Sequence, residues 1–316
     1  MAIKDIAVGE QLKGACFVLE KLNKEEGRFL AVLSDKTGKI MAEISPERYA
    51  CFENISEWVS SVVKITGPAL IENGEPIVHI KQAEIAQKGE FKPCEMYDGL
   101  SEEKVTLYRR ILADALNRIP DEGCRTLCKQ VLTNQLVTAL EQYPASLAYA
   151  AKYRGGALAQ TAMVVRFVMQ LGISMQKYEN GLYGNKLEWS VLLAGALLHM
   201  AAIPDYFEDQ PWRRTAVGID RGYMSLLQSR IERANRGEKP VSSTMMARIL
   251  NVLQVAQPKS VVKASTQEGV LLRQAVQTYT ETDMLALAVA QHTEDQFFDT
   301  RTRRHVNTVK VEEEAA

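Results

Sequence analysis

The pattern of apolar and polar positions changes once along the chain, near residue 90. Before this point, apolar residues alternate with polar ones over short runs, as they do in half-buried strands. After it, they recur about every 3.6 residues, as they do on one face of a helix. We expect strands at 14–19, 28–34, 39–44, 61–70 and 76–85. The chain is therefore predicted to be multidomain, with a β part followed by an α part.

Turn and cap residues give the order of elements in the β part. The run D-K-T-G at 35–38 and Asn73-Gly74 are turn signals, because glycine tolerates positive φ. Ser45 can cap a helix that starts at Pro46 and is expected to reach about residue 58. Three strands, a helix and two strands are the order expected of a five-stranded OB-like barrel. Residues 34–40 also resemble a hairpin of the OB-folds in nucleic-acid-binding proteins.

The α part is predicted to be all-helical. Its expected helices cover 101–118, 121–142, 157–170, 187–200, 221–235, 242–257 and 282–296. The helix at 187–200 is almost wholly apolar, so we expect it to be buried on all sides. The predicted domains are an OB-like barrel at 1–90, a linker at 91–100, a helical domain at 101–300 and a flexible tail at 301–316.

Composition limits the classes of partner and compartment. The 316 residues carry a formal net charge of −1, which gives no global field to attract a polyanion. The first residues lack the apolar core of a signal peptide, and no window is a continuous membrane span. We therefore expect a cytoplasmic protein with no membrane partner. Cys124 and Cys128 share one helical face but lack further ligands for zinc, which favours packing.

Two motifs in the α part resemble a known family. Residues 153–158 read Y-R-G-G-A-L, and residues 192–199 read L-L-A-G-A-L-L-H. Both are similar to motifs of the YhaM-type 3′–5′ exoribonucleases, in which an OB-fold precedes an HD phosphohydrolase domain. The resemblance implies an HD-type helical domain, in which histidines and an aspartate from separate helices bind divalent metals such as manganese. Such metals would activate water and neutralise the phosphate.

Most ligand positions that the resemblance implies are occupied by other residues. The histidine expected four residues after the second glycine is Gln160, and the aspartate expected after His199 is Met200. The histidine expected early in the next helix is matched by Tyr223. One imidazole alone provides too few ligands for a catalytic metal. We therefore predict no catalytic residues, no metal and a vestigial HD site at these four positions.

A replacement metal site is the alternative. An acidic loop follows His199, and another histidine lies on the last expected helix. The candidate ligands of this weaker alternative are His199, Asp205, Glu208 and His292. With a metal bound there, the protein would be a metal-dependent 3′–5′ exoribonuclease or phosphodiesterase.

Aromatic and basic residues provide candidates for nucleic-acid binding, because single strands are held by stacked bases and paired phosphates. In the barrel these candidates are Lys13, Phe29, Lys39, Lys64 and Lys81. In the helical domain they are Trp212, Arg213 and Arg214. Ordinary barrel core and solvated surface charge would explain the same residues.

The function predicted from the sequence is that of a noncatalytic HD-domain pseudoenzyme. Its expected partner is single-stranded RNA or DNA, a protein, or a second copy of the chain. A structural or assembly protein is a further alternative. No cofactor is expected unless the replacement site binds a divalent metal.

Overall fold

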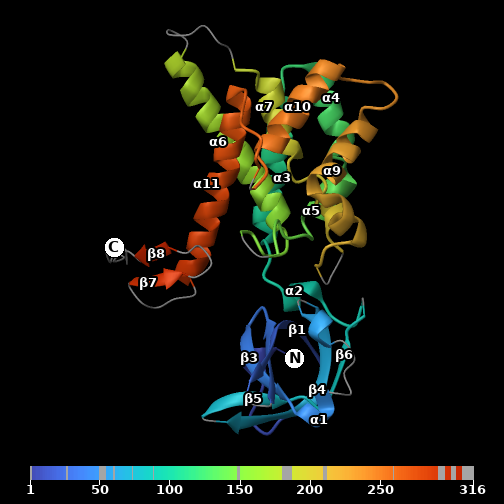
Figure 1. Cartoon of the computed structure of the whole chain (residues 1–316), viewed down its shortest axis with the longest axis vertical. Helices are drawn as coiled ribbons and strands as arrows, with labels where there is room; N and C mark the ends of the chain where they lie inside the picture. The colour runs from blue at the N-terminus through green and yellow to red at the C-terminus, as the bar shows by residue number, and fades with distance from the viewer. Residues whose placement is uncertain are drawn as a thin grey trace. The chain divides into compact units, whose positions relative to one another are not determined.

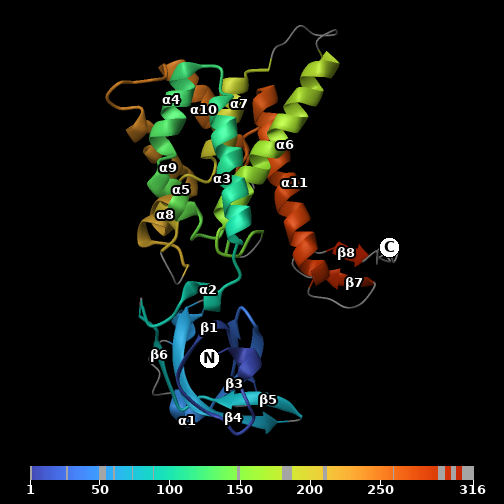
Figure 2. The ribbon, with the colours of Figure 1, turned by 180° about the vertical axis from the view of Figure 1, so that it is seen from behind.

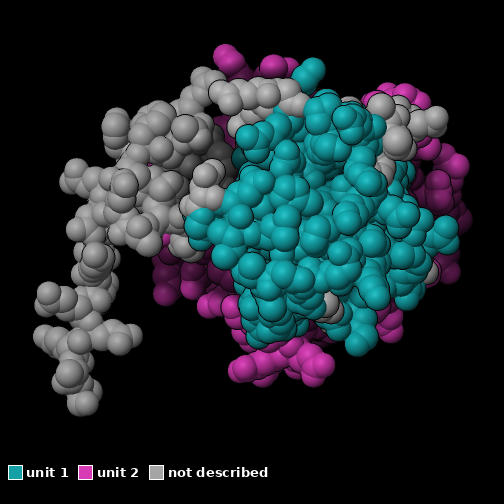
Figure 3. All heavy atoms as spheres, turned by 90° about the horizontal axis from the view of Figure 1, so that it is seen from below, with its two compact units in different colours: residues 1–99, 207–215 teal, residues 100–206, 216–316 magenta. Residues whose placement is uncertain are grey.

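The computed structural model describes most of the chain as two compact units (Figure 3). One unit contains residues 1–99 and 207–215, and the other contains residues 100–206 and 216–316. The segment 207–215 is thus flanked in sequence by the second unit although it belongs to the first. The described residues are 2–25, 28–49, 55–59, 61–72, 74–87, 89–147, 150–179, 187–208, 212–258, 260–290, 296–299 and 304–307.

The first unit is a closed five-stranded barrel of mixed strand direction (Figure 1). Its strands are β1 (Gln11–Glu25), β2 (Arg28–Asp35), β3 (Gly38–Ile44), β4 (Val62–Glu72) and β5 (Glu75–His79). They are paired in the order β1-β2-β3-β5-β4, and β4 pairs with β1 to close the barrel. The pair β3–β5 is parallel, and the other pairs are antiparallel. The prediction of an OB-like barrel is confirmed.

The expected last strand at 76–85 is divided in two. After β5, a separate strand β6 (Gln82–Ile85) pairs with the first half of β4. Between them, the backbone N–H of Lys81 donates to the carbonyl oxygen of Thr66 at 2.8 Å. Gly67 makes this approach possible, because a Cβ at this position would lie 2.0 Å from the carbonyl oxygen of His79. A single strand was therefore the wrong prediction.

The D-K-T-G turn is held by the buried carboxylate of Asp35. Its Oδ1 accepts hydrogen bonds from the backbone N–H of Thr37 at 2.6 Å and of Gly38 at 3.1 Å. Its Oδ2 accepts one from the backbone N–H of Ile3 at 2.7 Å, in the short 3₁₀ helix η1 (Ile3–Asp5). One side chain thus closes the β2–β3 hairpin and fixes the N-terminal segment on it.

Two short helices and an apolar segment complete the barrel unit. The helix expected at 46–58 appears as α1 (Pro46–Tyr49) and a 3₁₀ turn η2 (Ile55–Trp58), and residues 50–54 lie outside the described residues. The predicted linker at 91–100 contains α2 (Pro93–Met96). Met96 packs in a small apolar cluster with Val18 and Val62, so most of this segment is part of the barrel unit.

The second unit is helical, as predicted (Figure 2). Its helices are α3 (Glu102–Asn117), α4 (Glu122–Val131), α5 (Asn134–Leu140), α6 (Gly156–Glu179), α7 (Trp189–Leu198), α8 (Ile203–Tyr206), α9 (Ala216–Ala234), α10 (Ser243–Val255) and α11 (Gln267–Ala290). α6 and α11 pack side by side, as both cartoon views show (Figures 1 and 2).

Capping residues set the starts of several helices. Among the described residues, the side chains that accept a hydrogen bond from the backbone N–H three positions later at a helix start belong to Ser101, Asp121, Thr133, Ser242 and Thr266. The single helix expected at 121–142 is wrong, because Thr133 caps a new helix directly after α4.

The C-terminal part differs from the prediction. The last helix was expected at 282–296, but α11 starts at Gln267 and ends at Ala290. Two strands follow, β7 (Gln296–Asp299) and β8 (Arg304–Asn307), which pair as an antiparallel hairpin. Of the tail expected to be flexible at 301–316, residues 301–303 and 308–316 lie outside the described residues.

α7 is the central helix of the second unit. All residues from Ser190 to Leu198 are buried, which agrees with the apolar pattern of this run. It packs against α3, α4, α6, α10 and α11. Gly195 allows the closest of these contacts, because a Cβ there would lie 2.9 Å from side-chain atoms of Val252 and Leu272. This packing fixes the C-terminal end of α7, where His199 follows.

One helix among the described residues, at 156–177, is long and apolar enough to cross a membrane by length and composition. Of its most apolar stretch, 61% is buried inside the protein, as in the core helix of a folded domain.

Candidate functional site

The four vestigial positions lie around the C-terminal end of α7. The side-chain amide of Gln160, on α6, contacts the Met200 sulfur, with 3.6 Å between Nε2 and Sδ. The hydroxyl of Tyr223, on α9, donates a hydrogen bond of 2.6 Å to the carbonyl oxygen of His199. The structure thus brings these residues together from α6, α9 and the end of α7.

His199 is buried in a nearly apolar environment. Its side chain is at the C-cap of α7, and the residue is only 3% exposed. Nδ1 lies 2.8 Å from the carbonyl oxygen of Ala196, which can only accept, so we assign the proton to Nδ1. Nε2 is buried and has no hydrogen-bond partner among the described residues. Burial lowers the pKa of His199 to about 4, although the bond to Ala196 acts in the opposite direction. The imidazole is therefore neutral at pH 7.

The residues around His199 do not fit a catalytic divalent metal. Such a metal needs several imidazole or carboxylate ligands, whereas the neighbours are an amide, a thioether and a phenol. Burial raises the pKa of Tyr223, so its phenol stays protonated and is a poor ligand. Within the described ranges, His199 belongs to no group of three histidine, cysteine, aspartate or glutamate residues with donor atoms close together.

The acidic residues of the replacement site have other partners. The carboxylate of Asp205 accepts two hydrogen bonds from the Arg230 guanidinium, at 2.8 and 2.9 Å. Glu208 accepts one from Arg213 at 2.6 Å. His292 lies outside the described residues. The two carboxylates therefore already have a cationic partner each.

Trp212 is not a surface for base stacking. The residue is 5% exposed, and its ring centroid lies 4.3 Å from that of Tyr97 within the same unit. Its indole packs on Tyr97, so the proposed role in base binding stays a prediction that this packing does not favour. Of the two arginines that follow, Arg213 pairs with Glu208, and Arg214 forms a backbone bridge with Phe207.

The barrel residues predicted to bind nucleic acid fall into two groups, those that already contact other residues of the barrel and those that are exposed. Lys39 pairs with Glu20 at 2.5 Å, and Lys64 pairs with Glu84 at 2.7 Å and Glu90 at 2.8 Å. The hydrogen bonds that Lys64 donates to these two glutamates raise its pKa. Phe29 is half-buried and packs against the barrel core.

Lys13 and Lys81 are the exposed members of this set. The structure gives neither of them an ion pair among the described residues. Of the four lysines predicted to contact phosphates, these two are therefore the ones without a carboxylate partner in the described part of the barrel.

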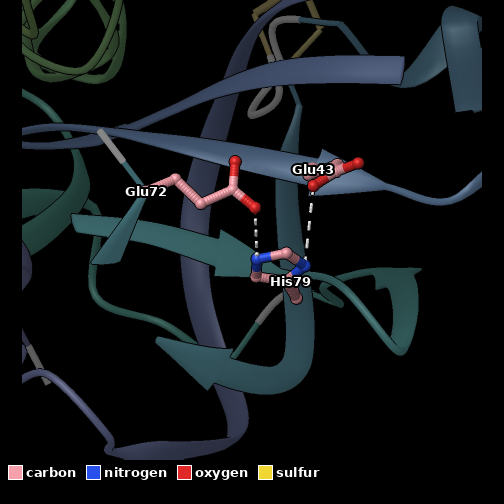
Figure 4. A group of neighbouring side chains, drawn as sticks. All are labelled: Glu43, Glu72 and His79. Atoms are coloured by element: carbon pink, nitrogen blue, oxygen red, sulfur yellow. Dashed lines mark ion pairs between the residues drawn. The ribbon is translucent and has the colours of Figure 1, made fainter. Parts of the chain in front are cut away.

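The sequence reasoning missed a group of three residues on the barrel (Figure 4). His79 lies between two carboxylates, with Nδ1 at 3.6 Å from Glu43 Oε2 and Nε2 at 3.3 Å from Glu72 Oε1. The three residues belong to β5, β3 and β4, and Glu43 and His79 are direct partners in the parallel pair. The three residues form no short sequence motif. They come together only through the pairing of β3, β4 and β5, which the sequence alone does not show.

No protein-family model matches the chain, and no curated protein matches it. The structure itself shows an OB-like barrel and a helical unit with a buried histidine at the end of its central helix. The YhaM-type relationship stays a prediction that depends on the motifs at 153–158 and 192–199.

Proposed function

We propose that the protein is a noncatalytic pseudoenzyme built on the frame of an HD-type phosphodiesterase, and that it acts by binding a partner. The contact between Gln160 and Met200 carries this proposal. It fills the space beside His199 with an amide and a thioether, where a phosphodiesterase of this type would hold a metal.

The charges of the barrel favour a protein partner over single-stranded nucleic acid. Phosphate binding needs lysines or arginines that can displace the counterions of the nucleic acid, but Lys39 and Lys64 are already paired with glutamates. Stacking needs open aromatic faces, but Trp212 is buried and Phe29 packs against the core. A protein partner makes neither demand.

Hydrolysis assays test the noncatalytic part of the proposal. The wild-type protein is incubated with manganese and either an activated phosphodiester or labelled single-stranded RNA. We expect no turnover above a protein-free control, and none in His199→Ala. Turnover by the wild type that is lost in His199→Ala but retained in His79→Gln would contradict the proposal, because it would require a working metal site at the end of α7.

Binding of labelled single strands tests the choice of partner. Fluorescence anisotropy is measured with RNA and DNA of about 20 nucleotides, at about 50 mM and about 200 mM salt. We expect no saturable, salt-dependent binding. Saturable binding that falls in the double variant Lys13→Ala/Lys81→Ala would instead establish a nucleic-acid partner. Lys39→Ala is the matched control, since this lysine is already paired with Glu20.

A further inference from the structure

The three residues missed by the sequence reasoning form a donor set on the barrel unit, separate from the helical site. One donor atom from each of Glu43, Glu72 and His79 lies within 4.8 Å of the others. Around a metal with bonds of about 2.1 Å, donor atoms lie roughly 3 to 4 Å apart. Glu43 lies nearest Nδ1 and Glu72 nearest Nε2 of His79, so one carboxylate must also rotate towards the other nitrogen before all three residues surround one ion.

The environment of His79 supports a ligand role. Its Nε2 is almost completely removed from solvent, yet it makes no hydrogen bond within the described part of the chain. It faces Glu72 at 3.3 Å, where a metal between the two residues would give it a partner (Figure 4). Glu43 is also largely withdrawn from water, with a side chain only 14% exposed. A carboxylate in this position benefits from a nearby cation.

Arg28 is the cation that now lies beside the two carboxylates. Its guanidinium is 4.0 Å from Glu43 and 3.6 Å from Glu72, and its side chain is 56% exposed. These distances are long, and neither is among the hydrogen bonds of the structure. The single positive charge of Arg28 thus faces two carboxylates. A divalent ion in place of the Arg28 guanidinium would therefore neutralise the charge of the two carboxylates more completely.

We infer that Glu43, Glu72 and His79 bind a divalent first-row transition ion, with Zn²⁺ as the representative. The imidazole nitrogen excludes Mg²⁺ and Ca²⁺, which prefer an all-oxygen set. Three protein ligands leave a fourth position for water or for a group from a partner. The ion would join β3, β4 and β5 on the barrel.

Calorimetric titration of the full-length protein with Zn²⁺ tests this site. The protein carries no histidine tag, and Cys16, Cys51 and Cys94 are replaced by serine so that thiols do not compete. We expect one saturable site. His79→Gln and Glu43→Gln should each weaken it by more than about 100-fold, because even changes outside the ligand shell cost about 10- to 100-fold.

Two further variants separate a metal site from an ordinary ion-pair cluster. Arg28→Gln should tighten Zn²⁺ binding roughly two- to five-fold, since it removes the competing charge. Glu20→Gln is the matched control, because it removes one barrel carboxylate, the partner of Lys39, and should leave the affinity unchanged. Circular dichroism confirms that each variant is folded. Absence of a saturable site in the wild type, or equal losses in Glu20→Gln and Glu43→Gln, would overturn the inference.

Discussion

The buried imidazole of His199 makes the stability of the helical unit depend on pH. Folding lowers the pKa of this group from 6.5 to about 4 by burial. Between these two values, the unfolded chain binds a proton that the folded chain does not bind. The free energy of unfolding therefore rises with pH in this window, and the contribution is lost as the pH falls.

The magnitude follows from the difference between the two pKa values. The full difference corresponds to about 3 kcal/mol, and about 2 kcal/mol is already lost between about pH 7.5 and about pH 5. No discount for solvent screening is needed, because the residue is only 3% exposed. This loss is a large fraction of the stability of an ordinary domain.

Two variants remove the titration in different ways. His199→Asn can keep a donor for the carbonyl oxygen of Ala196, whereas His199→Leu fills the site with an apolar side chain. Unfolding by urea is followed at 222 nm, which reports the helices, at about pH 7.5 and about pH 5. Both variants should lose about 2 kcal/mol less than the wild type over this interval, whatever their stability at neutral pH.

The test compares the change in the free energy of unfolding between the two pH values, so it does not depend on cavity effects. A smaller side chain lowers the free energy of unfolding by the same amount at both pH values. This cavity effect therefore cancels when the two free energies are subtracted. His79→Gln is a control for the general effect of replacing a histidine, and it lies in the barrel unit. An unchanged pH dependence in both His199 variants would refute the reasoning, because it would show that this imidazole is not held neutral by burial.

Two substitutions test the turns that shape each unit. Asp35→Ala should destabilise the barrel unit by about 3 kcal/mol, because the backbone N–H groups of Ile3 and Thr37 lose their acceptor. Urea unfolding followed by tryptophan fluorescence measures the free energy of unfolding. A decrease of less than about 1 kcal/mol would contradict this prediction. Gly156→Ala should destabilise the helical unit by about 2 kcal/mol or more, because its Cβ would lie 2.1 Å from the carbonyl oxygen of Ala151. The control Gly237→Ala meets no atom within 4 Å, so only its positive φ should cost about 1 kcal/mol in the same circular dichroism assay.

Local signals explain why much of the fold could be predicted. The D-K-T-G turn and the caps at Ser101 and Ser242 act over three or four residues, so the sequence shows them directly. The start of α11 was missed although Thr266 caps it by accepting a hydrogen bond from Gly269. The capping residue was therefore visible in the sequence. The polar residues that follow it interrupt the apolar repeat by which a helix is recognised.

Long-range packing explains what the sequence could not reveal. β5 and β6 separate where the chain crosses β4 at Gly67, which depends on closure of the barrel. The place of segment 207–215 depends on the contact between Trp212 and Tyr97, residues that are far apart in sequence. Trp212 next to Arg213 and Arg214 suggested a binding surface. The structure instead packs Trp212 against Tyr97, which lies far away in the sequence.

The residues that replace the implied ligands are all uncharged, and burial gives a reason for this. A carboxylate at position 200 would be buried beside Gln160 at the end of α7, as the Met200 side chain is. An unpaired buried charge costs several kcal/mol, so an aspartate at this position would destabilise the unit unless a cation accompanied it. Met200 and Tyr223 instead fill the site with groups that are stable without an ion, and Tyr223 adds a hydrogen bond to the His199 carbonyl. The retained imidazole fits the same scheme, because burial keeps it neutral and the Ala196 carbonyl satisfies its one donor. Packing at the end of α7 is therefore complete without an ion, because uncharged side chains and one neutral imidazole occupy these positions.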